Sequence, residues 1–582
     1  MFVKYSKYKV EVTDRKFVTD DGIEYAYSAI VTFIADEKQN KQVNQFGYIE
    51  QEDIFKKIDN KEIINLNQCY VNKLSLSDYR EKKGMDKTDF VEIKGLTAQN
   101  AFIDSLQPID LSYTKFDVGD ILFNNSIIAN GDFSFHGSIF NHGNINFSYT
   151  KFNCDVIDFS NTLFGDGELN FKNSLFTKGY KNFQYANFGN GDIIFINAEF
   201  NDGDVCFINC IFHEGDVLFK IARFGTGKVD FHYAKFGKGN ISFEKAEFGD
   251  GGADFRNIEF HNAKVNFNRS LFGHGEISFD GCEIAEGKFY FRKVKIGGGG
   301  FDFSNVGFKE SEVFFDDTSF GDGKISYFNS KFRKLSLKSC NLDNYIDLRV
   351  AYCYELDFSD AVISNIIDLK PFDFKIDIHT FNLTGIRLLG RIYIDWHKNE
   401  VKKLIYNQVD SSYLNKAEQF RTLKQNFNSI GLYYDEDSAY VEFKRMESED
   451  ILESDRKKKG FYFFRGTISY LFKKIVFDYI GLYATSPERV LTSVVFIWFG
   501  FGMTYFLCHL TGLGDTVSAV GNPDHLSALV QSFYHSAITF FTIGYGDVYP
   551  IGLSRFFSAF EGFMGVFMMS YFTVAFVRKI LR

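Results

Sequence analysis

Residues 542 to 547 read Thr-Ile-Gly-Tyr-Gly-Asp, and the backbone of this hexapeptide has the composition needed to bind a dehydrated cation. Gly544 and Gly546 tolerate backbone angles that other residues resist, so the segment can extend with its carbonyl groups on one side. Four such segments around an axis would form rings of oxygens that replace the hydration shell of a potassium ion. The expected K⁺ ligands are the Thr542 hydroxyl and the backbone oxygens of Thr542, Ile543, Gly544 and Tyr545.

Two apolar stretches flank the hexapeptide. Val490 to Leu510 contains no Asp, Glu, Lys or Arg, and Phe556 to Val577 contains only Glu561. Each stretch is long enough to cross about 30 Å of hydrocarbon as a helix. Residues 526 to 541 suit a short helix that runs into the hexapeptide. This layout resembles the two-transmembrane potassium-channel pore domain, to which we assign residues 487 to 582.

The resemblance implies roles for the residues around this selectivity filter. Asp547 follows the filter, as it does in the family, where it bonds back to the pore helix; by position its partner is Tyr534. Tyr534 and His535 stand where family members usually carry two Trp, so we expect both to support the filter. Phe541 stands where a second Thr is usual. Tyr545 is expected to point away from the ions and brace the strand.

The second apolar stretch carries three candidates for gating, Glu561, Gly562 and Gly565. A carboxyl group is costly inside a membrane span and is therefore a functional candidate, although a carboxyl bonded behind the filter is an equal explanation. Gly565 matches the hinge glycine of the family's inner helix, and Gly562 is a second candidate. The alternative for both glycines is close helix packing.

A repeat fills the middle of the chain. From Leu111 to Phe332, large apolar residues recur at alternating spacings of five and seven residues. Each repeat contains one spacing of each kind, and there are 19 repeats. Phe occupies the first slot in 17 repeats and the second slot in 16, so the pattern is not accidental. Small residues usually stand two positions before the second slot, and Gly usually stands four before the first. Such self-similarity indicates a solenoid whose repeats bury their apolar sides against one another.

The pattern of small residue, Phe and glycine turn resembles the pentapeptide-repeat family, whose right-handed β-helix has four faces per coil. Two repeats would then close one coil, and a two-faced coil built from a single repeat is the alternative. We assign residues 109 to 398 to this β-helix, with regular repeats at 111 to 332 and degenerate ones to about 370. Residues 1 to 108 lack the repeat and are expected to form a β-rich cap, or else a sensing region.

Residues 399 to 459 are predicted to form a helical linker, because apolar residues recur there at spacings of three and four. Residues 417 to 449 resemble the helical hairpin that joins repeat arrays to membrane domains in bacterial pentapeptide-repeat channels. Residues 460 to 486 are rich in aromatic side chains but carry four charges. This composition favours a helix in the membrane interface over a third crossing.

Charge and cysteine content indicate the compartment. The eight cysteines form no CxxC pair, which predicts buried thiols in a reducing cytosol. Lys and Arg cluster before the first span and after the second, and none lies between residues 511 and 554. The positive-inside rule therefore places both termini in the cytoplasm. We expect a multi-pass protein of the bacterial inner (plasma) membrane, in contact with membrane lipid.

No residue set typical of an enzyme is present; Gly225-Thr-Gly-Lys228 resembles a phosphate loop but lacks the required Ser or Thr and the following helix. The sequence predicts a homotetrameric, potassium-selective channel with no cofactor besides permeant K⁺. Its cytoplasmic β-helix would be a regulatory or interaction region that binds an unknown ligand or protein, and no nucleic-acid partner is expected. The alternatives are a non-selective membrane-pore effector of a defence system, or an acidic β-helix rod that acts as a DNA mimic or protein-binding scaffold.

Overall fold

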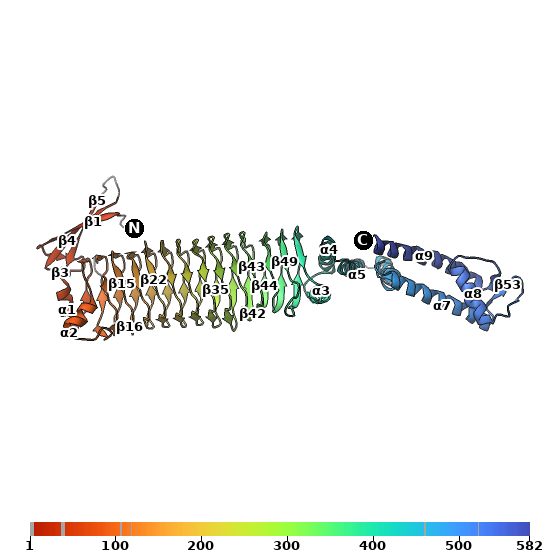
Figure 1. Cartoon of the computed structure of the whole chain (residues 1–582), viewed down its shortest axis with the longest axis horizontal. Coiled ribbons are helices and arrows are strands. Elements are labelled where there is room, and N and C mark those ends of the chain that lie inside the picture. The colour runs from red at the N-terminus through yellow and green to blue at the C-terminus, as the bar shows by residue number, and fades with distance from the viewer. Residues whose placement is uncertain are drawn as a thin grey trace. The chain divides into compact units, whose positions relative to one another are not determined.

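The structure of the protein is a computed structural model that describes residues 5–35, 41–104, 108–117, 119–458, 461–521 and 523–581. The chain divides into two compact units, Met1–Gln408 and Val409–Arg582 (Figure 1). Each unit is described by itself.

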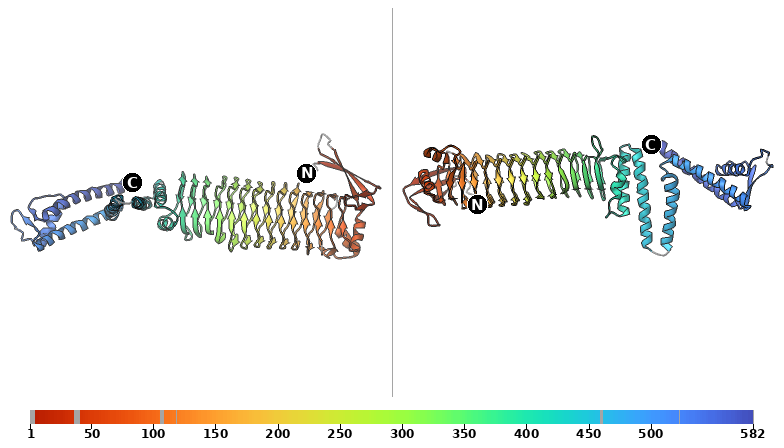
Figure 2. Two further views of the ribbon diagram at one scale, coloured as in Figure 1. Left: turned by 180° about the vertical axis from the view of Figure 1, so that it is seen from behind. Right: turned by 90° about the horizontal axis from the view of Figure 1, so that it is seen from below.

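The first unit is a β-solenoid of short strands that pair in parallel from coil to coil (Figures 1 and 2). One coil contains β24 (Ile193–Ile194), β25 (Glu199–Phe200), β26 (Val205–Cys206) and β27 (Ile211–Phe212). β24 pairs in parallel with β28 (Val217–Leu218), so that Ile193 lies opposite Val217. The four-faced coil of two repeats is therefore confirmed. The coil of a single repeat is wrong, because β24 does not pair with β26.

The phenylalanine ladder forms the core of the solenoid. Phe207 stacks on Phe231 of the next coil, with ring centroids 4.7 Å apart and planes inclined by 7°. Within its own coil it meets Phe195 nearly edge-on, at 6.1 Å and 81°. Offset stacking and edge-to-face contact are the arrangements that aromatic rings prefer. Phe207 and Phe195 are fully buried, as the repeat predicts.

Glycine and small residues let successive coils approach closely. A Cβ on Gly227 would lie 2.2 Å from the backbone oxygen of Gly203 in the preceding coil, so no larger residue fits that corner. In the small-residue position, the Cys210 thiol donates to the carbonyl of Phe183 at 2.9 Å. All eight cysteines are free and buried, as expected.

The coils start earlier than the phenylalanine pattern indicates. β6 (Ile64–Asn65) already pairs in parallel with β9 (Leu96–Thr97), and β7 (Cys69–Val71) pairs with β10 (Phe102–Asp104). Coiling therefore begins at Ile64 and not at residue 109. Outside the coils lie the antiparallel strands β1 (Lys7–Thr13), β4 (Tyr27–Ile34) and β5 (Lys41–Tyr48) and the helices α1 (Gln51–Asp59) and α2 (Leu76–Lys83).

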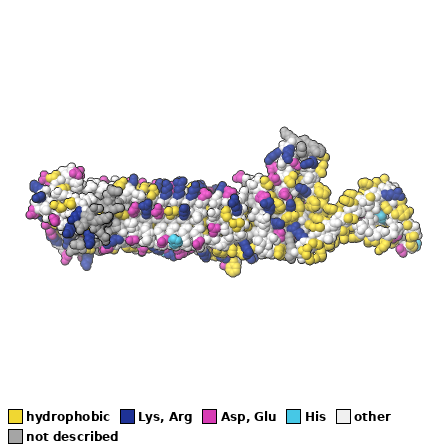
Figure 3. Space-filling view, turned by 90° about the horizontal axis from the view of Figure 1, so that it is seen from above, with side chains coloured by type: hydrophobic (Ala, Val, Ile, Leu, Met, Phe, Trp, Pro, Cys, Tyr) yellow, Lys and Arg dark blue, Asp and Glu magenta, His cyan; other side chains and the backbone are white. Residues whose placement is uncertain are grey.

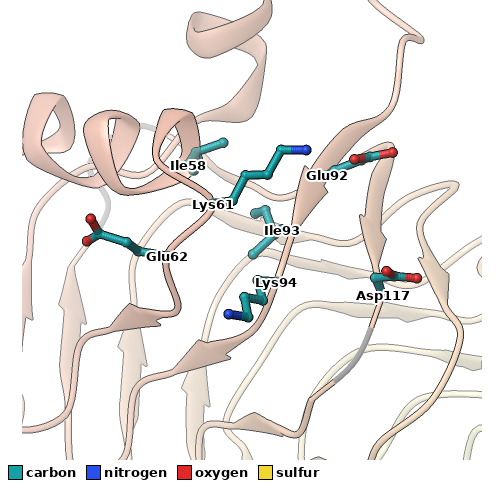
Figure 4. A pocket seen from close by; sticks show the side chains of 7 residues that line it. All are labelled: Ile58, Lys61, Glu62, Glu92, Ile93, Lys94 and Asp117. Carbon is teal, nitrogen blue, oxygen red and sulfur yellow. The ribbon is translucent and has the colours of Figure 1, made fainter.

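A hollow of about 350 Å³ lies beside the end of α1 (Figure 4). Its lining residues are Ile58, Lys61, Glu62, Glu92, Ile93, Lys94 and Asp117. The charged members are exposed and carry both signs, so their charge does not select one class of ligand.

The second unit is mostly helical. α4 (Tyr413–Ser429) and α5 (Tyr433–Lys457) form a hairpin that turns at Gly431, where φ is +76°. α6 (Phe461–Phe472) runs directly into η1 (Lys473–Tyr479), a π-helix that the sequence pattern did not indicate. The first unit ends with the short helix α3 (Val401–Tyr406), so the stretch predicted to be helical contains α3, α4 and α5.

α7 (Pro487–Thr511), α8 (Ala528–Phe540) and α9 (Ser554–Ile580) follow. Among the described residues, α7 and α9 are the two helices long and apolar enough to cross a membrane, and they contain both predicted spans. Pro487 opens α7, and the Ser486 hydroxyl accepts a hydrogen bond from the Arg489 amide at 3.3 Å. β53 (Gly514–Ser518) and β54 (Val548–Gly552) form an antiparallel pair that was not predicted.

Candidate functional site

The short helix α8 ends just before the hexapeptide. The Ser527 hydroxyl caps its first turn by accepting from the Val530 amide at 3.4 Å. α8 packs against both α7 and α9. A Cβ on Gly565 would lie 2.0 Å from the backbone oxygen of Phe540, so this glycine permits close contact between α9 and the end of α8. Gly562, in contrast, has open space around its Cβ position.

The hexapeptide alternates between two backbone conformations. Thr542, Gly544 and Gly546 have φ values of +55°, +62° and +75°, whereas Ile543 and Tyr545 do not have positive φ. Such alternation turns successive peptide groups toward one side, whereas successive carbonyls of a regular strand point to opposite sides. The arrangement therefore suits a row of carbonyl oxygens that face a common axis.

Short hydrogen bonds fix the start of this segment. The amides of Ile543 and Gly544 both donate to the carbonyl of Ile538 in α8, at 2.9 and 3.2 Å. The Thr542 hydroxyl donates to the carbonyl of Phe541 at 2.7 Å. Donation uses the hydroxyl proton and leaves the lone pairs of this oxygen available to a cation.

The far end of the hexapeptide is tied to α8. The Tyr534 hydroxyl donates to the Asp547 carboxylate at 2.7 Å, which is the contact expected from the positions of these two residues. His535 lies elsewhere: its Nε2 is 3.2 Å from the Ser558 hydroxyl of α9, and its ring is 5.0 Å from that of Tyr505 in α7. These contacts join α8 to α7 and α9. Support of the filter by His535 stays a prediction.

Glu561 joins three helices. It is fully buried, and its carboxylate accepts hydrogen bonds from the Tyr505 hydroxyl of α7 at 2.6 Å and from the Ser536 hydroxyl of α8. The Ser536 hydroxyl is also 3.0 Å from the carbonyl of Trp498. Sequence reasoning singled out Glu561 but missed Tyr505 and Ser536. A search for hydroxyl groups inside the first apolar stretch and the short helix before the hexapeptide would have found them.

α5 contacts the C-terminal end of α9. Asp437 accepts hydrogen bonds from Arg578 at 3.0 Å and from Lys579 at 2.9 Å. The Arg578 guanidinium also lies 4.4 Å from the ring centre of Tyr440, and the Lys579 ammonium lies 4.6 Å from that of Tyr434. Cation–π contacts add to the ion pairs at this position.

α5 also contacts η1 through Arg445. The guanidinium of Arg445 donates to Asp478 of η1 at 2.8 and 2.9 Å and to Glu442 at 2.7 Å. Burial by itself would lower the pKa of Arg445, but the hydrogen bonds and charges of the two carboxylates raise it above its ordinary value. α5 therefore contacts both η1 and α9.

One further group of potential ligands lies in the solenoid. Asp230, His232 and Asp254 bring their ligand atoms within 4.8 Å of one another across adjacent coils. The Asp254 carboxylate, however, already accepts from Lys228 at 2.9 Å and from Arg256 at 2.6 Å. Burial would raise the pKa of Asp254, but these hydrogen bonds hold it well below its usual range. Two cations already neutralise this carboxylate, so we assign no metal to the group.

Comparison with known proteins agrees with this geometry. Residues 493–582 match the family described as Ion channel. Protein LctB of Geobacillus stearothermophilus is 37% identical over 73 residues, which is 12% of this chain and 53% of that protein. Protein LctB of Bacillus caldotenax is 35% identical over 71 residues, with the same coverage. The chain thus spans about half the length of the curated relatives it matches, and no solved structure matches it.

Proposed function

We propose that this chain, a β-solenoid joined to an ion-channel domain of the two-transmembrane type, forms a potassium-selective channel. The main evidence is the backbone conformation of the hexapeptide, in which Thr542, Gly544 and Gly546 have positive φ and the residues between them do not. Hydrogen bonds from the amides of Ile543 and Gly544 to the carbonyl of Ile538 hold this segment at the end of α8. Carbonyl rings built from such segments replace the hydration shell of K⁺.

The pore is a homotetramer in this proposal. In the single chain the side chains of Ile543 and Tyr545 are 50% and 73% exposed, and nothing lies within 4 Å of the Cβ positions of Gly544 and Gly546. One filter segment supplies one side of a carbonyl ring, so four copies are needed to close it. The channel lies in the bacterial inner membrane with both termini in the cytoplasm.

The solenoid surface argues against the DNA-mimic alternative. Opposite charges alternate along its columns: Arg223 lies between Glu199 at 3.3 Å and Glu247 at 3.4 Å, and Lys235 pairs with Glu259 at 3.0 Å. Figure 3 shows both signs of charge along one face. A DNA mimic needs a surface of one sign. Interleaved charges fit a scaffold or regulatory rod better.

Regulation reaches the pore through α5 in this proposal. Its contacts with Arg578 and Lys579 at the end of α9, and with Asp478 in η1, are direct. A change in the position of α5 would therefore act on the inner helix without passing through the filter.

Ion flux into liposomes that contain the purified full-length chain tests the proposal. We expect K⁺ to enter much faster than Na⁺. Equal rates for the two ions would contradict selectivity and favour the non-selective pore.

A further inference from the structure

A cavity of about 360 Å³ lies within the second unit, where α5, η1 and α9 meet the segment that precedes α7. Its wall includes Tyr440, Lys444, Lys473, Phe477, Tyr483 and Tyr571. These residues come from parts of the chain that we have assigned to the linker, the interface and the inner helix.

The inner helix forms part of the cavity wall through Tyr571. The Tyr571 hydroxyl donates to the carbonyl of Phe477 in η1 at 3.1 Å and accepts from the amide of Ala484 at 3.0 Å. A Cβ on Gly481 would lie 2.7 Å from the same ring, so the fit is close. A molecule in the cavity would therefore touch the helix that lines the pore.

The charge of the lining is positive. Lys444 pairs with Glu447 at 2.7 Å, which leaves Lys473 as the second cation of the wall. Lys473 is half-buried, and within the described part of the chain no ion pair uses it. A partly desolvated ammonium group beside a cavity gains from an anionic ligand.

Lys473 lies in a segment with unusual backbone geometry. Lys473 and Phe477 both belong to the π-helix η1, and π-helical segments occur frequently at functional sites. η1 is anchored from outside by the ion pair between Asp478 and Arg445 at 2.8 Å. The unusual helix is thus a fixed element that places one cation and one aromatic ring in the cavity wall.

The cavity lies next to the start of a candidate membrane span, where the headgroups of a bilayer would be. The first membrane helix begins at Pro487, shortly after Tyr483 of the wall. At the junction of α6 and η1, the apolar residues Leu471, Phe472 and Ile475 are about half exposed. Apolar side chains next to a cationic site at the end of a membrane span suit an acyl chain below a phosphate.

We propose that this cavity binds the phosphate headgroup of an anionic phospholipid, with Lys473 as its main ligand. The aromatic rings of Phe477 and Tyr483 border the glycerol region, and the acyl chains lie along the exposed apolar side chains of α6 and η1. Only the effect on ion flux rests on the channel function proposed above; binding itself does not.

Binding of fluorescent phosphatidylglycerol to the purified full-length chain in detergent tests this site. Each Lys near a membrane surface contributes about 1 kcal/mol of general attraction, or roughly a fivefold change in affinity. Lys474→Gln is the matched control, because the Lys474 ammonium already binds the Tyr470 hydroxyl at 3.1 Å and does not line the cavity. We expect Lys473→Gln to lose at least about tenfold more affinity than Lys474→Gln.

Three further outcomes decide the proposal. Lys473→Arg keeps the positive charge and should retain lipid binding. This result would show that Lys473→Gln loses affinity because the charge is gone and not because the variant misfolds. Equal losses in Lys473→Gln and Lys474→Gln would overturn the site. Displacement of the lipid by excess inorganic phosphate would assign the cavity to a soluble anion and would also overturn it.

A flux measurement separates this proposal from the channel proposal. In vesicles of phosphatidylcholine with phosphatidylglycerol, wild-type K⁺ flux should differ from flux in phosphatidylcholine alone, and Lys473→Gln should reduce the difference. Absence of flux in every vesicle would count against the channel, whereas the binding data would still decide the lipid site.

Discussion

Asp437 of α5 accepts a hydrogen bond from Arg578 of α9 at 3.0 Å, across 141 residues of sequence. Lys579 reaches the same carboxylate at 2.9 Å. The Asp437 side chain is only 9% exposed, so water screens this ion pair poorly. This carboxylate therefore binds both cations at the end of α9, beside the cation–π contacts of Tyr440 and Tyr434, at a position where small movements of α5 would reach α9.

Asp437→Asn should alter gating without altering selectivity. The amide removes the negative charge that holds both cations, so the state in which the contact exists loses stability relative to the other state. A difference of about 1.4 kcal/mol changes an equilibrium tenfold, and we expect a change in open probability of that order. Single-channel recording in lipid bilayers measures it.

Glu453→Gln is the matched control, because Glu453 forms an exposed pair with Lys457 on the same helix at 2.7 Å. Exposed pairs contribute little, so its gating should match that of the wild type. Unchanged open probability in Asp437→Asn would show that the contact is equally strong in both states.

Gly544→Asp should abolish potassium flux. Gly544 has φ +62°, a conformation that a Cβ resists, and a carboxylate there would add charge beside the proposed carbonyl ring. Gly500→Ala on α7 is a suitable control, because no atom lies within 4 Å of its Cβ position. Persistent K⁺-selective flux in Gly544→Asp liposomes would remove the hexapeptide from the ion path.

The repeat of the solenoid was predictable from sequence because it is periodic. Side-chain contacts between residues far apart in the chain were not. The inward positions of Phe195 and Phe207 follow from the repeat spacing. The coil of two repeats was implied by the resemblance to pentapeptide-repeat proteins, and only the pairing of Ile193 with Val217 decided it against the coil of a single repeat. The earliest coils were missed because Leu66 and Ala98 are buried where later coils carry Phe.

Contacts at the candidate site depend on helix packing, which leaves no local signal. Tyr534 could be matched to Asp547 by position, but the partners of Glu561 lie 56 and 25 residues away, on α7 and α8. The contact between Asp437 and Arg578 has no periodic signature either. Such pairs become visible only when the helices are assembled.

Phe207→Ala should destabilise the solenoid locally by about 3–5 kcal/mol. The ring is fully buried and stacks on Phe231, so its removal leaves a cavity that the coils cannot fill. Hydrogen exchange of the full-length chain, followed by mass spectrometry, should show faster exchange in neighbouring coils. Glu214→Gln is the control, because its pair with Lys238 is exposed and 3.9 Å long. Equal protection in the two variants would disprove the inward position of the ring.

Lys181 makes the stability of the solenoid depend on pH. It is fully buried in the column of Ile157 and Val205, and its ammonium donates to the carbonyl of Asp202 at 2.6 Å. Burial lowers the pKa of Lys181 from its ordinary 10.5 to about 8. Between these values the unfolded chain binds more protons than the folded one, so stability rises with pH in this window. Below pH 8 both states are protonated, and the destabilisation is constant.

Lys181→Met should therefore raise stability at neutral pH, by up to about 3 kcal/mol, and should flatten the pH dependence between about 8 and 10.5. The protease resistance of the solenoid in urea, followed in the full-length chain, measures both effects as differences from the wild type. Tyrosines that titrate at high pH cancel in this difference. Lys178→Met removes an exposed lysine that pairs with Asp155 at 2.6 Å, and it should leave the pH slope unchanged. A Lys181→Met variant that keeps the wild-type slope would show that this lysine stays protonated in the folded solenoid throughout the window.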